Sequence, residues 1–170
     1  MLQLETARLR LLPCSEEMAR AAISQRAELE NLVGAHVPAA WPTPDLCDLL
    51  PFYADHLARD PAWLGWGVWL LLDDSARTLV GDAGFKGPPD AGTVEIGYGV
   101  LPAFQRRGYA TEAARALVRW AFAQPQIEQI IAECLADNVP SIRVLQRLGM
   151  QPRPPAAPML RWELRREAAR

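Results

Sequence analysis

The sequence lacks a surplus of basic residues. Its 18 Lys and Arg residues are outnumbered by 20 Asp and Glu residues, which gives a formal net charge of -2 at pH 7. Proteins that bind nucleic acid or acidic membranes need a basic surface, so neither partner is expected. Lys86 is the only lysine, and this bias toward arginine carries no functional signal. Any cluster of arginines is therefore local and suited to a small anion.

Cysteine and histidine are also scarce. The three cysteines, Cys14, Cys47 and Cys134, are far apart and form no C-x-x-C pair. An odd number of separated cysteines is typical of reduced thiols, so we expect no disulfide framework and a cytoplasmic protein. His36 and His56 are isolated, with no cysteine or carboxylate at metal-ligand spacing. The sequence therefore predicts no metal site.

Long apolar runs and nucleotide motifs are missing as well. The first twelve residues interleave charges with apolar residues, unlike a signal peptide or a membrane span, and no later run reaches spanning length. There is no Walker pattern, and no G-x-G-x-x-G follows the first expected strand. The sequence therefore disfavours a membrane protein and a protein that binds nucleotide phosphates through either of these motifs.

The length of 170 residues and the 50% hydrophobic composition suit one domain with a substantial core. Strands are expected at 2–12, 63–72, 78–85, 93–100, 130–135 and 159–164, and helices beginning near 16, 45, 111 and 138. Tight connections between successive strands predict an antiparallel meander, and the strand, helix, strand run from 93 to 135 predicts a parallel crossover. The expected fold class is α+β, with a mixed, mostly antiparallel central sheet of about six to seven strands flanked by helices.

The segment 105–111, QRRGYAT, joins an expected strand to an expected helix. Glycine lets the backbone approach a ligand closely, and a helix start exposes free N–H groups beside the positive end of its dipole. Arg106 and Arg107 add fork-shaped donors that suit phosphate oxygens. The segment predicts a phosphate cradle, the alternative being an ordinary solvated loop.

Three segments together resemble one family. EIGYGVLPAFQRRGYATEA and the later IIAECLADNVPSIRVLQRLGM resemble the GCN5-related N-acetyltransferases (the GNAT family). The opening LETARLRLLP resembles its RimJ/RimL-type branch of ribosomal-protein alanine acetyltransferases. Gln105, Gly108 and Ala110 match the family pattern Q/R-x-x-G-x-G/A. Asn138 and Ser141, followed by leucine and glycine at 148–149, match its N-x-x-S element.

The resemblance implies acetyl-coenzyme A as the acyl donor, held in a slot between splayed central strands. Within the single domain, residues 1–92 would then hold the N-terminal strand, the acceptor-side helices and the antiparallel meander, 93–150 the coenzyme-binding core, and 151–170 a loop, a strand and a charged tail. The strand 93–100 would carry a bulge, for which its glycines are suited. The residues implied in coenzyme binding are Gly99, Val100, Arg106, Arg107, Gly108, Tyr109, Ala110, Thr111, Asn138 and Ser141.

The reaction requires a proton acceptor for the amine, a donor to the thioester oxygen and a proton for the leaving thiolate. The resemblance makes Glu95 the first candidate for the base, with Glu133 and water as alternatives. In many relatives a tyrosine supplies the proton to the leaving thiolate, and this sequence has Leu145 at that position. Ser141 is therefore the candidate for the sulfur, and the amide of Val100 for the thioester oxygen.

The acceptor side is the least defined part of the sequence. The resemblance favours a primary amine, either a protein or peptide N-terminus or a small molecule. We expect a monomer or a homodimer. Trp41 and Tyr98 are the candidates for acceptor binding, whereas Trp63, Trp66 and Trp69 are expected in the core. The missing tyrosine leaves one alternative open, a catalytically degenerate module that binds and senses acyl-coenzyme A.

Overall fold

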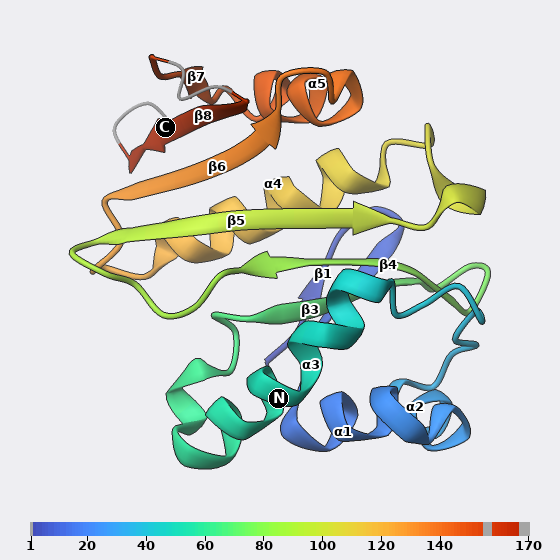
Figure 1. Ribbon diagram of the computed structural model, residues 1–170. Coiled ribbons are helices and arrows are strands. Elements are labelled where there is room, and N and C mark those ends of the chain that lie inside the picture. The colour runs from blue at the N-terminus through green and yellow to red at the C-terminus, as the bar shows by residue number, and fades with distance from the viewer. Residues whose placement is uncertain (1, 155–157, 167–170) are drawn as a thin grey trace.

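A single eight-stranded sheet organises the computed structural model, which describes residues 2–154 and 158–166. Its one parallel pair is β5 with β6, and the other neighbours are antiparallel. The predicted mixed sheet is confirmed, with eight strands where about six to seven were expected. The strand expected at 2–12 is divided into β1 and β2, and β7 has only two residues, too few for a hydrophobic pattern. In spatial order (Figure 1) the strands are β1 (Leu4–Glu5), β2 (Leu9–Pro13), β3 (Val68–Asp73), β4 (Thr78–Phe85), β5 (Thr93–Val100), β6 (Gln129–Leu135), β8 (Met159–Arg165) and β7 (Gln151–Pro152).

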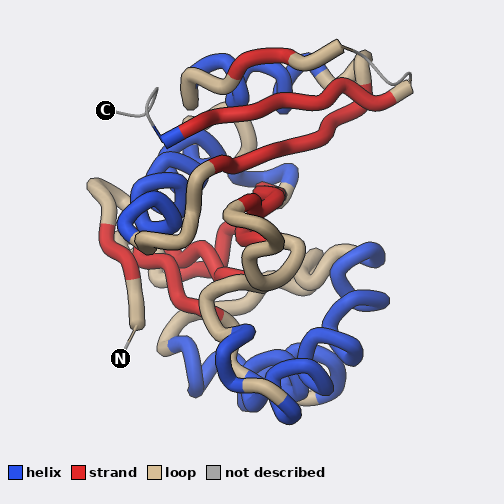
Figure 2. Tube along the Cα trace, turned by 90° about the vertical axis from the view of Figure 1, so that its left-hand side faces the viewer, coloured by secondary structure: helices blue, strands red, loops and turns tan. Residues whose placement is uncertain are grey.

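Helices cover the sheet in two groups, which Figure 2 separates. The first group is α1 (Glu16–Ser24), α2 (Arg26–Val33) and α3 (Pro44–Arg59), and the second is α4 (Tyr109–Ala123) and α5 (Val139–Arg147). Short 3-10 turns lie at η1 (Pro61–Trp63) and η2 (Pro102–Phe104). Within β3, Trp69 and Leu71 join the core beneath α4, whereas Leu70 and Leu72 join the core beneath α1–α3. A central strand covered on both faces accounts for the continuous apolar run in the sequence.

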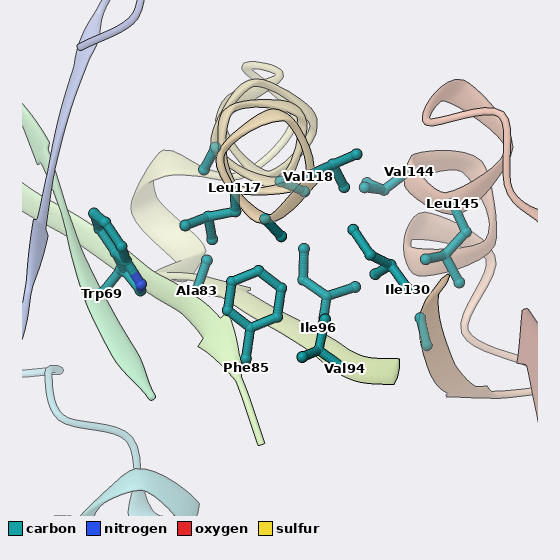
Figure 3. Close-up of a cluster of buried hydrophobic side chains, with 14 of the residues drawn as sticks. Trp69, Ala83, Phe85, Val94, Ile96, Leu117, Val118, Ile130, Val144 and Leu145 are labelled. Atoms are coloured by element: carbon teal, nitrogen blue, oxygen red, sulfur yellow. The ribbon is translucent and has the colours of Figure 1, made fainter. Parts of the chain in front are cut away.

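The α4 core fixes the helix whose first turn forms the site. Figure 3 shows Leu117 and Val118 pointing from α4 toward Phe85 and Ile96 of the sheet and toward Val144 of α5. Burial of each such side chain contributes roughly 1.5–3 kcal/mol, so the orientation of α4 against β4 and β5 is strongly determined.

Several element boundaries differ from expectation. The strand expected from 63 begins only at Val68, because Gly65 has a φ of 91° and residues 61–63 form η1. Helix α3 runs through Pro51, where a split or kink was expected, and this proline lies on its exposed side. The expected loop at 151–158 and tail at 165–170 fall partly outside the described residues. No helix in the described part of the chain is long and apolar enough to cross a bilayer.

Candidate functional site

The sheet ladder opens between β5 and β6. The two strands pair only over Thr93–Glu95 of β5 and residues 129–131 of β6. Beyond that point β5 continues along β4 to Val100, and β6 continues along β8 to Leu135. Figure 1 shows β6 rising away from β5 toward its arrowhead. The predicted splay of the central strands is confirmed.

Backbone groups of β5 point into this opening. In an antiparallel pair, hydrogen-bonded residues alternate with residues whose peptide groups face away. The register between β4 and β5 is unbroken, so the peptide groups of Gly99 face β4, whereas those of Tyr98 and Val100 face the opening. The expected bulge is absent from this pairing, and a register shift lies instead between β3 and β4. Two backbone hydrogen bonds show which residues face β4. The Lys86 amide donates to the Glu95 carbonyl oxygen at 3.0 Å, and the Leu101 amide donates to the Val80 carbonyl oxygen at 2.9 Å.

The turn before α4 presents a row of free amides. Gly108 is the N-cap residue, with a φ of 84° in the left-handed region that favours glycine. No amide from Arg106 to Thr111 donates a hydrogen bond to an acceptor among the described residues, and the Glu112 amide closes the first turn onto the Gly108 oxygen at 3.0 Å. These N–H groups lie at the positive end of a 15-residue helix. Free N–H groups at this end of a helix suit an anion, which is the kind of ligand that the sequence predicts for this turn.

Two contacts hold this turn in place. Arg8 donates from Nη1 to the Arg107 oxygen at 2.8 Å, and its Nη2 lies 2.6 Å from Oε2 of Glu112. Arg8 thereby neutralises the one acidic residue of the first turn of α4. Tyr109 donates its hydroxyl to Asp73 at the end of β3. This bond, followed by those from neighbouring groups, lowers the pKa of Asp73 to about 2, so the carboxylate that anchors Tyr109 is ionised at neutral pH.

The free amides border a cleft of about 730 Å³ between β5 and α5. The charged residues among those that line it are all arginines, namely Arg106, Arg143 and Arg147. Arg107 does not line the cleft; its guanidinium lies over the Phe104 ring, 5.7 Å from the centroid. The two arginines of α5 were not identified from the sequence, although their spacing of four residues places them on one face of a helix. The cleft therefore suits a ligand with several negative charges.

Tyr98 and Ser141 meet across the cleft. The Tyr98 hydroxyl lies 3.0 Å from Ser141 Oγ and donates to the Ser141 carbonyl oxygen at 3.2 Å. Burial raises the pKa of Tyr98 to about 12, so its phenol stays protonated. Asn138 accepts from the Ser141 amide at 3.2 Å and caps α5. Leu145 is fully buried in the α4 core, so the only tyrosine that reaches Ser141 within the described residues comes from β5.

The two predicted candidates for the base are both paired. Val94 and Ile96 join the α4 core, so by strand alternation Glu95 lies on the opposite face of β5. There it forms an ion pair with Lys86. Glu133 on β6 pairs with Arg161 of β8, with 2.7 Å between Oε1 and Nε. No cluster of three or more metal-binding side chains occurs in the described ranges.

A third carboxylate, Asp82 of β4, was not identified from the sequence. It pairs with Gly99 in the ladder, and its Oδ2 accepts from the Trp41 indole at 2.8 Å. Burial raises the pKa of Asp82 to about 6, with the bond from Trp41 opposing the shift. Trp41, the predicted acceptor-binding residue, is fully buried in the core beneath α1–α3 and does not line the cleft. The sequence did contain a signal that could have identified Asp82, because it is the one acidic residue in the mostly apolar strand TLVGDAGF.

Comparisons with known proteins agree with this geometry. Residues 8–151 match the model of the acetyltransferase (GNAT) domain. YjdG of Bacillus subtilis (strain 168), an uncharacterized N-acetyltransferase, is 32% identical over 150 residues, which are 88% of this chain and 89% of YjdG. The ribosomal-protein-S5-alanine acetyltransferase from Vibrio fischeri is 15% identical, with a TM-score of 0.71 over 100% of both chains. RimL, a ribosomal L7/L12 α-N-protein acetyltransferase solved with coenzyme A, is 16% identical, with a TM-score of 0.70 over 98% of this chain and 99% of its own. These two likenesses concern the fold, and the sequence matches decide the family: the chain belongs to the GNAT acetyltransferases.

Proposed function

We propose that the protein transfers the acetyl group of acetyl-coenzyme A to a primary amine, with both substrates bound at once. The observation that carries this proposal is the row of free amides from Arg106 to Thr111, which borders a cleft whose charged lining residues are arginines. A diphosphate needs this combination of backbone donors, a helix dipole and fixed positive charge.

The opening between β5 and β6 fits the pantetheine arm. An extended chain with amide groups can pair like an added strand with the peptide groups of Tyr98 and Val100. The Val100 amide would then donate to the thioester oxygen as that oxygen gains negative charge, and a fixed backbone donor needs no reorganisation to do so. The peptide groups of Gly99 face β4, so Gly99 would help to admit the pantetheine arm only by having no side chain.

The leaving thiolate would meet Ser141. In the proposed reaction the amine nitrogen attacks the thioester carbon, the C–S bond breaks, and the sulfur takes a proton. Ser141 can donate its hydroxyl hydrogen to the sulfur when the single Tyr98 hydroxyl hydrogen turns from the Ser141 carbonyl oxygen to Ser141 Oγ. The base was left open by the sequence among Glu95, Glu133 and water, and both glutamates form ion pairs, Glu95 with Lys86 and Glu133 with Arg161.

A primary amine is the proposed acceptor class. RimL is named for action on the α-amino group of a ribosomal protein, which supports a peptide N-terminus as one candidate. A small-molecule amine is the other. Both are cationic at neutral pH and must lose a proton before attack.

Two measurements test the proposal. Acetyl-coenzyme A should raise the melting temperature, whereas ATP should not, because only the former has an arm that fills the opening. Free thiol should then appear with at least one member of an amine panel: tripeptides beginning with alanine or serine, spermidine, and free amino acids. Binding without thiol release from any amine would favour a coenzyme sensor, and absence of binding would refute the coenzyme assignment itself.

A further inference from the structure

An open strip of backbone lies on the face of β5 away from α4. Gly97 and Gly99 are both exposed there. A Cβ atom added at Gly97 would meet no heavy atom within 4 Å, and one added at Gly99 would meet only Oδ1 of Asp82, at 3.9 Å. The two glycines therefore form a strip of β5 without side chains, with Asp82 beside Gly99 and Glu95 two residues before Gly97.

Asp82 is the carboxylate placed beside the predicted reaction centre. It lies opposite Gly99, the residue before Val100, whose amide would hold the thioester oxygen. Glu95 lies four residues back along β5, about 13 Å away at the rise of an extended strand. Glu133 is on the far side of the opening and is paired with Arg161. Of the three, Asp82 is nearest to where an amine would attack.

One oxygen of Asp82 is fixed and the other is available. Oδ2 accepts from the Trp41 indole, whereas Oδ1 accepts no hydrogen bond from any described residue. Asp82 also keeps part of its surface exposed. A carboxylate held in this way presents one oxygen in a defined direction, as binding of an ammonium group requires.

The indole is itself held in place. Arg26 donates from Nη1 to three carbonyl oxygens of the loop that carries Trp41, at 2.6–3.0 Å. The Trp41 ring is fully buried in the core beneath α1–α3. Such a buried, hydrogen-bonded support is what positions a functional side chain within a fraction of an ångström.

We infer that Asp82 binds the ammonium group of the acceptor on this open face and takes up its proton, with Trp41 as its positioning residue. The inference rests on the proposed acetyl transfer. Of the three ammonium protons, one passes to Asp82 before attack, one passes from the attacking nitrogen to the sulfur, and one stays on the new amide. Asp82 then releases its proton to water, so each turnover is balanced.

The surrounding charges suit this role. A carboxyl with a pKa of about 6 is ionised at pH 7 and yet retains a higher proton affinity than an ordinary aspartate. The nearby Cys14 thiol stays neutral, because burial and the charge of Asp82 raise its pKa to about 12. On the same face the Glu95 and Lys86 charges offset each other. Coenzyme would thus enter past arginines, and a cationic amine would enter from the opposite face past a carboxylate.

Asp82→Asn tests the inference, with Asp48→Asn at an exposed position of α3 as the matched control and Glu95→Gln as the test of the rival base. The asparagine oxygen can still accept from Trp41, so the positioning bond survives while the proton acceptor is lost. With the best acceptor of the amine panel, kcat/KM at pH 7 should fall by about 100-fold or more in Asp82→Asn and by less than about 3-fold in Asp48→Asn, and the loss in Glu95→Gln should be smaller than that in Asp82→Asn. Calorimetry should find the acetyl-coenzyme A Kd of all three variants within about 2-fold of the unmodified protein.

The pH profile gives a second readout. In the unmodified protein, kcat/KM should rise to a plateau above about pH 6, whereas in Asp82→Asn it should keep rising toward the pKa of the free amine. Near-normal kcat/KM in Asp82→Asn, or a larger loss in Glu95→Gln, would overturn the inference while leaving acetyl transfer intact. Absence of thiol release from the unmodified protein would instead refute the proposed function.

Discussion

Asp82→Asn should make the fold more stable at neutral pH. The pKa of Asp82 rises from an ordinary 3.8 to about 6 in the folded protein, because burial penalises its charged form. The folded state therefore holds this proton more tightly than the unfolded chain, and stability falls as the pH rises from about 4 to 6. At about 1.4 kcal/mol for each pKa unit, the full penalty is about 3 kcal/mol above pH 7, and about 1 kcal/mol is already present at pH 4.5.

Asparagine does not ionise, so the Asp82→Asn variant does not lose folding stability at this position as the pH rises. Relative to the unmodified protein, it should gain about 2 kcal/mol between pH 4.5 and 7.5, or roughly 4–8 °C in Tm for a chain of this size. Urea unfolding or calorimetry at the two pH values measures the gain, and every other titrating group cancels in the comparison. Asp48→Asn, at an exposed position of α3, is the control for replacing a carboxylate elsewhere in the chain. An equal stability difference at both pH values would mean that Asp82 ionises like a surface carboxylate, which would refute the reasoning.

Three further outcomes are expected. Gly108→Asp should weaken acetyl-coenzyme A binding by at least about 100-fold in calorimetry, because it adds strain at a φ of 84° and negative charge at the cradle; unchanged affinity would exclude this turn as the diphosphate site. Ser141→Ala should lower kcat by about 10-fold or more with little change in KM for the amine, and an unaltered kcat would remove Ser141 from the thiolate step. Tyr109→Phe should cost about 1–2 kcal/mol at pH 7 in urea unfolding, since it removes the donor to Asp73. That cost should shrink as the pH falls from about 4 toward 2, where the Asp73 carboxylate becomes protonated, and a cost independent of pH would contradict the role of the ionised pair.

The local parts of the site were predictable from the sequence. The free amides before α4 depend only on a strand, a glycine turn and a helix start, which residues 93–123 encode within one continuous segment. Likewise, Asn138 was recognisable because a helix cap and its partner Ser141 are three residues apart.

The acceptor side was not predictable in the same way. Trp41 and Asp82 meet across 41 positions of sequence, and their contact depends on how the loop beyond α2 folds over the sheet. Tyr98 reaches Ser141 across 43 positions, which no local pattern reveals. One helix was expected from about residue 16, and the break at Gln25 that divides it into α1 and α2 was missed. Short elements and long-range polar pairs are set by tertiary packing, and local hydrophobic periodicity does not encode them.

The short pairing of β5 with β6 has a consequence for turnover. Three residue pairs join the two halves of the sheet, and the arm proposed to bridge the rest of the opening is the same before and after the acetyl group leaves. Spent coenzyme should therefore hold the halves together about as firmly as fresh coenzyme, because the diphosphate and pantetheine contacts are retained. Dissociation of coenzyme A must break these contacts, so we expect it to be the rate-limiting step of turnover. Added coenzyme A should then be a strong competitive inhibitor with respect to acetyl-coenzyme A.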